Sequence, residues 1–146
     1  MALRRKGGYW YGDSQDDIPA ELKRYGKANR YEPTVFADAR CSCGGKAFRL
    51  RTDEEEGVAV RSCITCAAEH PIGDSAAYLE GASLESHVCL CDSPDFEITV
   101  GLALYTGSED IRWLYIGCRC LACGLVGNFA DWKNEYSDYR KLLALV

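Results

Sequence analysis

The sequence predicts a small, metal-stabilised α+β protein with two β-hairpin units, an N-terminal helix and a C-terminal helix. Three observations support this prediction. Nine of the 146 residues are cysteine, which is far above the usual share, while 47% are hydrophobic, as in globular proteins. Eight of the cysteines fall into two groups of identical layout. Each group encloses an apolar run, a turn and a second apolar run, which predicts a hairpin.

The spacing of the cysteines indicates metal binding. In each group a C-x-C pair is followed, after a hairpin-length segment, by a C-x-x-C pair. Short pairs let neighbouring thiolates turn toward one ion, and two pairs supply the four sulfurs that tetrahedral zinc prefers. We therefore expect two structural Zn²⁺ ions. The expected ligands are Cys41, Cys43, Cys63 and Cys66 in the first group and Cys89, Cys91, Cys120 and Cys123 in the second.

A disulfide framework is the competing interpretation, and two features disfavour it. The number of cysteines is odd, and the start, MALRRKGGYWYGDSQ, has basic residues without the apolar run of a secretory signal. No stretch approaches the roughly 18 apolar residues of a membrane-spanning helix. We expect a cytoplasmic protein with no membrane association, in which the thiols are reduced.

The two cysteine groups also agree outside the cysteines. Five residues after each C-x-C pair stands a phenylalanine, Phe48 or Phe96, and an aliphatic residue follows two positions later. Eight residues after each C-x-x-C pair stands an aspartate, Asp74 or Asp131. The shared frame is C-x-C-x4-F-x-[LI] … C-x2-C-x5-[IF]-x-D. We interpret this agreement as an internal repeat.

This layout resembles the zinc-ribbon family, in which two cysteine knuckles at one end of a β-hairpin clamp one zinc ion. The resemblance covers about 41–75 and 89–132, with C-x-C at each first knuckle instead of the commoner C-x-x-C. It implies two closed, structural metal sites. The second half, GCRCLACG followed by DWKNE, also looks like a group of small bacterial proteins, a likeness that implies no function.

Each hairpin can be placed from its apolar pattern. In the first unit, Ala47–Arg51 and Val58–Arg61 predict strands on either side of an acidic tip. In the second unit, residues 96–104 alternate with the period of a strand, and Ile111–Ile116 returns after a Gly-Ser-Glu-Asp turn.

Helices are expected in three places. A Ser and an Asp at capping distance, followed by a proline, predict a helix near 16–28. A short helix is expected over 74–80. A C-terminal helix is expected to open at Asp131 or Asn134.

These elements suggest three segments: an N-terminal helical segment at 1–40 that packs on the ribbons, a first ribbon at 41–80, and a second ribbon with the C-terminal helix at 81–146. The Gly-Ala-Ser run at 81–83 is the expected linker. Units this small rarely bury enough surface to fold alone. The zinc ions are therefore expected to stabilise the fold, and metal loss to unfold it.

The charge of the chain limits its partners. The sequence has 17 basic and 22 acidic residues, for a formal charge of −5. Each zinc with four thiolates adds −2, which brings the total to −9. Nucleic-acid binding requires basic faces, and here the basic groups lie at 4–6 and 23–30. We expect a protein partner with a basic surface and disfavour nucleic acid.

Several residues allow two interpretations. Cys118, two residues before Cys120, is either a packed strand cysteine or a substitute ligand or redox-responsive thiol. His70 and His87 could replace a cysteine ligand, but four sulfurs make this unnecessary, so a surface or supporting position is preferred. Closed sulfur sites and the lack of a nucleophile–His–Asp pattern predict no catalytic residues.

The acidic run and the tryptophans are also ambiguous. Residues 53–56, Asp-Glu-Glu-Glu, form either a solvated hairpin tip or a docking prong for a basic surface. Trp10, Trp113 and Trp132 are expected in the core or over the knuckles, but an exposed Trp132 would be an interface anchor.

The function expected from these features is a non-enzymatic, zinc-binding, acidic protein-binding module, in its sharpest form an inhibitor (immunity protein) of a nucleic-acid-directed or NAD-directed toxin. The alternative is a nucleic-acid-binding zinc ribbon that uses the N-terminal basic segment. A third hypothesis, a zinc-dependent or redox enzyme, requires a reactive Cys118. Iron in a rubredoxin-like site is the alternative metal.

Overall fold

All ten strands of the computed structural model, which describes residues 3–146, belong to one antiparallel sheet. The strands are β1 (Arg4–Lys6), β2 (Tyr9–Tyr11), β3 (Val35–Asp38), β4 (Phe48–Asp53), β5 (Val58–Cys63), β6 (Glu69–Pro71), β7 (Glu85–Ser86), β8 (Phe96–Leu104), β9 (Ile111–Cys120) and β10 (Leu125–Lys133). The helical segments are the 3₁₀ helix η1 (Gln15–Asp17), α1 (Ile18–Ala28), the 3₁₀ helix η2 (Ser75–Gly81) and α2 (Tyr139–Leu143). The chain is therefore a small α+β protein dominated by its sheet.

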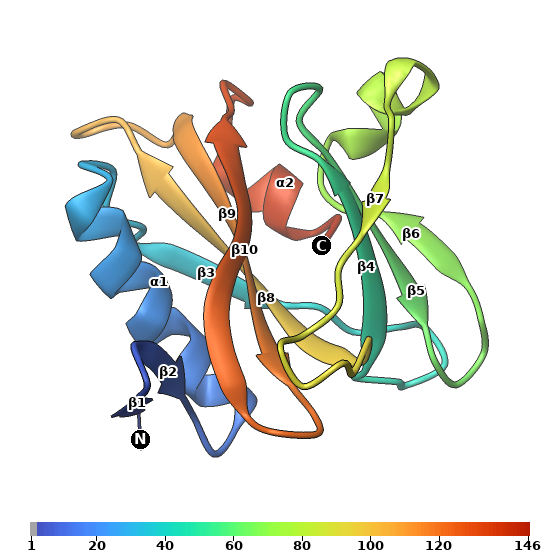
Figure 1. Ribbon diagram of the computed structural model, residues 1–146. Helices are drawn as coiled ribbons and strands as arrows, with labels where there is room; N and C mark the ends of the chain where they lie inside the picture. The colour runs from blue at the N-terminus through green and yellow to red at the C-terminus, as the bar shows by residue number, and fades with distance from the viewer. Residues whose placement is uncertain (1–2) are drawn as a thin grey trace.

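Two meanders make up most of the sheet. The smaller contains β4, β5 and β6, and the larger contains β8, β9 and β10, with β4 and β8 joined through the pair Phe48↔Phe96. The order along the sheet is β1-β2-β10-β9-β8-β4-β5-β6, while β3 pairs with β8 and β7 pairs with β4. In Figure 1 the two meanders face each other across the molecule.

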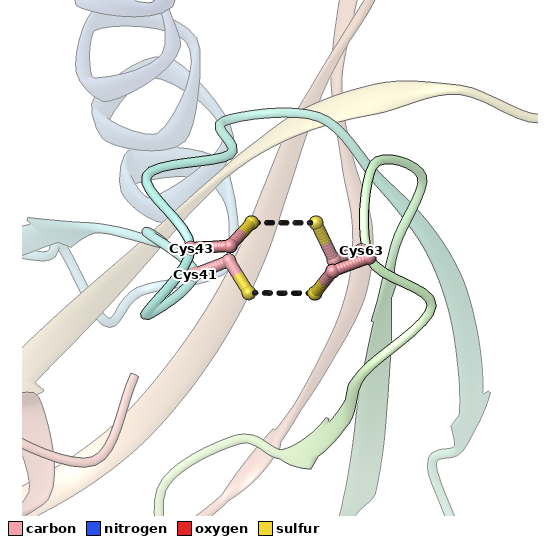
Figure 2. Close-up of side chains that lie close together, drawn as sticks. Cys41, Cys43 and Cys63 are labelled. Atoms are coloured by element: carbon pink, nitrogen blue, oxygen red, sulfur yellow. Dashed lines mark hydrogen bonds between the residues drawn. The ribbon is translucent and has the colours of Figure 1, made fainter.

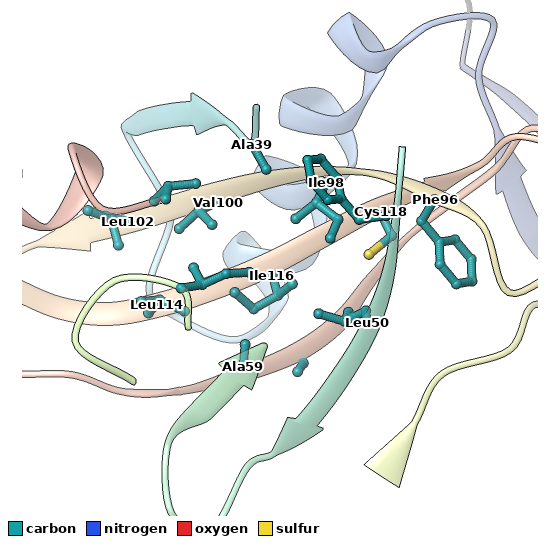
Figure 3. Packing of buried hydrophobic residues seen from close by; sticks show 14 of the residues in the cluster. Ala39, Leu50, Ala59, Phe96, Ile98, Val100, Leu102, Leu114, Ile116 and Cys118 are labelled. Atoms are coloured by element: carbon teal, nitrogen blue, oxygen red, sulfur yellow. The ribbon is translucent and has the colours of Figure 1, made fainter. Parts of the chain in front are cut away.

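The main core lies between the meanders. Alternate residues of β8, from Phe96 to Leu102, are fully buried on one face, as the alternation of the sequence predicts. Figure 3 shows these side chains facing Leu50 of β4 and Ala59 of β5. Leu142 of α2 joins the same cluster and closes one end of it.

Helix α1 covers the opposite face of the larger meander. Ile18 and Leu22, both fully buried, pack on Tyr115. Two glycines allow this close approach: a Cβ at Gly117 would lie 2.5 Å from Ile18, and one at Gly101 would lie 3.1 Å from Leu22. The helix predicted near 16–28 is confirmed. No helix within residues 3–146 has the length and apolar character needed to span a membrane.

The C-terminal helix begins later than predicted. An opening at Asp131 or Asn134 is wrong, because Leu125–Lys133 forms β10 and pairs along β9. The helix begins at Tyr139, where the Asp138 side chain accepts a hydrogen bond from the backbone N–H of Arg140. The short helix expected over 74–80 is the 3₁₀ helix η2.

The cysteine-bearing hairpins have equivalent registers within this continuous sheet. Phe48 pairs with Cys63 in β4–β5, and Phe96 pairs with Cys120 in β8–β9. The strands are longer than the sequence predicts, since β5 and β9 both run into the first cysteine of a C-x-x-C pair. The sulfur groups consequently sit at the ends of strands that are themselves part of the core.

Candidate metal centres

The first sulfur group joins the loop between β3 and β4 to the end of β5. A tight turn, in which the N–H of Gly44 donates to the carbonyl of Cys41, brings Cys41 and Cys43 together. Across from them stand Cys63, the last residue of β5, and Cys66 in the following loop. The Sγ atoms of Cys41 and Cys66 are 3.5 Å apart, and those of Cys43 and Cys63 are 3.6 Å apart (Figure 2).

The second group has the same construction. The N–H of Asp92 donates to the carbonyl of Cys89, which turns the loop between β7 and β8 and brings Cys91 beside Cys89. Cys120 ends β9, and Cys123 follows in the next loop. The Sγ atoms of Cys89 and Cys123 are 3.6 Å apart, and those of Cys91 and Cys120 are 3.5 Å apart.

The sulfur geometry fits one tetrahedral ion in each group. Four sulfurs at about 2.3 Å from a zinc ion lie roughly 3.8 Å from one another. In both groups all four sulfurs lie within 4.8 Å of one another. All nine cysteines are free, and the sulfur separations far exceed the bond length of a disulfide, about 2.05 Å. The eight predicted cysteines are therefore assembled into two sets that can each hold a metal ion.

The protonation of the thiols favours metal capture. The backbone N–H of Cys43 and the neighbouring sulfurs lower the pKa of Cys41 to about 6. Burial acts against ionisation of Cys120, but backbone N–H groups, chiefly that of Cys123, outweigh it and bring its pKa to about 7. Burial raises the pKa of Cys89 to about 12. The lowered pKa values of Cys41, Cys63 and Cys120 favour thiolates in both groups, and the remaining protons leave when a cation supplies the compensating charge.

A buried cation lies beside the first group. The Arg61 side chain, 6% exposed, donates hydrogen bonds to the carbonyls of Val146 and Arg40 at 3.1 Å and lies over the Phe48 ring. Burial lowers the pKa of Arg61, and the negative charge of Cys41 acts in the opposite direction. The guanidinium is placed to offset the charge of a four-thiolate site. Arg61 was not expected at the site from the sequence, although the repeat aligns it with Cys118.

Cys118 is close to the second group in sequence but is not part of it. Its side chain is fully buried, among the core residues shown in Figure 3. Burial raises its pKa well above the ordinary value for a thiol. Of its two interpretations, the structure agrees with the packed strand cysteine, because its sulfur is not among the four that lie together in the second group and a buried, protonated thiol is a poor nucleophile.

The two histidines lie outside both sulfur groups. The Nε2 atom of His70 is 2.6 Å from the carbonyl oxygen of Leu145, and the Nε2 atom of His87 is 2.7 Å from the Oγ1 atom of Thr52. Burial lowers the pKa of His87. The His70 ring therefore links β6 to the C-terminal segment, and the His87 ring links the end of β7 to β4.

Some of the N-terminal basic residues are paired with acidic neighbours. Arg4 pairs with Asp13 at 2.6 Å, and Arg24 forms two hydrogen bonds with Glu21 at 2.5 and 2.9 Å. The Arg24 guanidinium also lies over the half-buried Trp10 ring. These contacts reduce the positive charge that the segment presents to a phosphate backbone.

Comparison with protein-family models, with curated proteins and with solved structures finds no match for this chain. The resemblance to zinc ribbons therefore remains a prediction, supported by the cysteine layout and the sulfur geometry. The two four-cysteine groups themselves indicate a metal-binding protein with two sites.

Proposed function

We propose that this chain is a non-enzymatic, zinc-stabilised, acidic module that binds a protein with a basic surface. The observation that carries the proposal is the closure of both sulfur groups. Each presents four sulfurs within 4.8 Å of one another, which fill the coordination of a tetrahedral ion and leave no position for a substrate or an activated water.

A structural role for the metals agrees with where they would lie. The first would fasten the β3–β4 loop to the end of β5, and the second would fasten the β7–β8 loop to the end of β9. The cysteines at these strand ends, Cys63 and Cys120, belong to the main core. Zinc is preferred because two paired knuckles on hairpins are typical of structural zinc. The equivalent registers of the two hairpins favour an internal repeat of zinc-ribbon units.

Charge supports a protein partner over nucleic acid. Two zinc sites bring the formal charge from −5 to −9, which repels phosphate and attracts basic proteins. The nucleic-acid alternative depends on the N-terminal cations, and Arg4 and Arg24 are held by carboxylates. An inhibitor that occludes the basic site of a toxin is the sharpest form of the proposal, and it rests on charge and size.

The proposal is tested by capture followed by reconstitution. The tagged, zinc-loaded chain is incubated with nuclease-treated lysate of its host, and retained proteins are purified and titrated against it at several salt concentrations. The proposal expects a 1:1 complex with a basic protein that weakens as salt rises. Binding only to nucleic acid, or no complex at any ionic strength, would contradict it.

A further inference from the structure

Two features that lie far apart in the sequence line one open groove of about 520 Å³. Glu54, Glu55 and Glu56 of the β4–β5 turn form one wall. Trp132 and its neighbours at the end of β10 form another, and Tyr78 of η2 contributes an aromatic ring that is 52% exposed. We call this feature the acidic groove.

The groove has an excess of negative charge. Asp74 and Glu135 also line it, and the lining cation Lys133 is paired with Glu135 at 3.2 Å. Within residues 3–146, Glu54, Glu55 and Glu56 have no ion-pair partner of their own. Glu54 instead accepts a hydrogen bond from the backbone N–H of Asp131, which fixes the acidic turn against β10.

An unpartnered donor lies in the same groove. Trp132 is only 7% exposed, so it is not the exposed anchor considered from the sequence. Of the described side-chain atoms, Asn128 Oδ1 alone is both sealed from solvent and without a partner. The indole N–H of Trp132 also has no hydrogen-bond partner among residues 3–146, and it is not sealed in the same way.

Gly57 lies against the indole edge that carries Nε1 of Trp132. Its φ of +70° suits the turn, and a Cβ there would lie 3.2 Å from Trp132 Nε1. Glycine leaves this edge of the indole clear of any side chain from residue 57. A ligand that brings an acceptor to the groove takes the place of water on this donor.

These observations select the chemistry of the occupant. The carboxylates attract a cation, the indole N–H offers a hydrogen bond to an acceptor, and the exposed Tyr78 ring can stack with a planar cation. A bare metal cation offers no acceptor, and an anion is repelled by the carboxylates. An arginine-bearing peptide segment has both a guanidinium and backbone carbonyls.

We infer that the acidic groove binds a short arginine-bearing segment of a partner protein, an inference that rests on the proposed function. The guanidinium pairs with carboxylates of Glu54, Glu55 and Glu56 and stacks on Tyr78. A carbonyl of the bound segment accepts a hydrogen bond from the indole N–H of Trp132. These side chains come from the β4–β5 turn, η2 and β10, which the fold brings together.

The test uses the full zinc-loaded chain and a blocked glycine peptide that contains three arginines. The same peptide with citrulline in place of arginine removes the charge while keeping the shape. Binding is followed by calorimetry and by the indole ¹H–¹⁵N resonance of Trp132, which is assigned with a Trp132→Phe variant. The groove variant carries Glu54→Gln, Glu55→Gln and Glu56→Gln. The amide oxygen introduced by Glu54→Gln can still accept the bond from the backbone N–H of Asp131.

A matched control removes three acidic charges elsewhere, by Asp16→Asn, Glu32→Gln and Asp110→Asn. The expected result is that the Trp132 indole resonance shifts as the arginine peptide is added. The midpoint of this shift should equal the midpoint of the binding curve measured by calorimetry. The groove variant should lose about tenfold in affinity or more, since three charge contacts are removed, while the control should change less than about threefold. The citrulline peptide should not shift the resonance.

A Trp132 resonance that does not move, or equal losses in the groove and control variants, would overturn the inference. Failure of the groove is distinguishable from failure of the proposed function. If a purified protein partner binds the groove variant as tightly as the wild type, the groove inference is wrong while the proposed function stands. If neither the arginine peptide nor any basic protein binds, both are wrong.

Discussion

Arg61 and Cys118 occupy equivalent positions in the two cysteine-bearing hairpins. Arg61 pairs with Leu50 on β4, and Cys118 pairs with Ile98 on β8. Each lies two residues before the first cysteine of a C-x-x-C pair. The first sulfur group consequently has a buried guanidinium beside it, whereas the second has a neutral, buried thiol at the same place. The two sites share their ligands but differ in electrostatic environment.

We predict that Arg61→Met weakens metal binding at the first site and leaves the second unchanged. Interactions of a charged group with a hydrogen-bonding partner contribute about 1.5–3 kcal/mol, or roughly ten- to a hundredfold in affinity. The ¹¹³Cd spectrum of the cadmium-loaded chain should show two site signals. During chelator titration of the variant, one signal should disappear earlier. Equal loss of both signals would show that Arg61 acts only through general stability.

Each sulfur group has an exposed cysteine in its C-x-x-C pair, Cys66 or Cys123, that can be replaced on its own. We predict that Cys66→Ser and Cys123→Ser each reduce the metal content by one ion per chain, because each removes one of four sulfurs. Cys118→Ala is the matched control. It should retain both ions and cost only about 1 kcal/mol of stability from the small cavity. Native mass spectrometry reads the stoichiometry directly, and loss of an ion from the control would make Cys118 a ligand.

The contact between α1 and the sheet predicts a steric effect. In Gly117→Ala the new Cβ would lie 2.5 Å from Ile18 Cγ2, which forces the helix or the strand to move. Overpacking of this kind costs about 1–3 kcal/mol. Gly127→Ala is the control, since a Cβ there meets its nearest neighbour at 3.5 Å. Denaturant unfolding should show a substantial loss for the first variant only; equal stability of the two would contradict the packing described.

Asp74 predicts a pH dependence of stability. Burial raises its pKa, although the hydrogen bonds donated by Asn134 lower it. Because the folded pKa exceeds the unfolded value, the stabilising contribution of the protonated carboxyl is present at acidic pH. It is lost as the pH rises from the unfolded pKa through the folded pKa. Asp74→Asn should therefore gain stability relative to the wild type over that interval.

The measurement for Asp74 is the difference in unfolding free energy between wild type and variant at each pH. Taking this difference cancels titrations that both chains share, including those of the cysteines. A difference that stays constant with pH would show that burial of Asp74 has no net cost.

The local parts of the fold could be predicted from the sequence because they depend on short-range patterns. Cysteine spacing identified both sulfur groups, and alternation identified β8. Capping residues placed α1. β10 was missed because a register shift between Asn128 and Ala130 interrupts its alternation. Asp131 and Asn134 suggested helix caps, but their side chains make other hydrogen bonds. Asp131 accepts one from the Trp113 indole, and Asn134 donates one to Asp74.

The long-range parts could not be predicted because no local pattern encodes them. The pairing of Phe48 with Phe96, which joins the meanders, links residues 48 positions apart. The position of Arg61 beside the first sulfur group depends on hydrogen bonds to Val146 and Arg40. The acidic groove likewise arises only when the β4–β5 turn meets the end of β10.

Stabilisation of the fold by two structural metal ions can be tested on one sample. Native mass spectrometry of the purified chain gives the number and mass of bound ions. Circular dichroism follows folding as a chelator removes them and zinc is returned. We predict two zinc ions per chain, loss of structure when both are removed, and recovery when zinc is added. A chain that binds fewer than two ions, or that stays fully folded without them, would show that the metals do not hold this fold together.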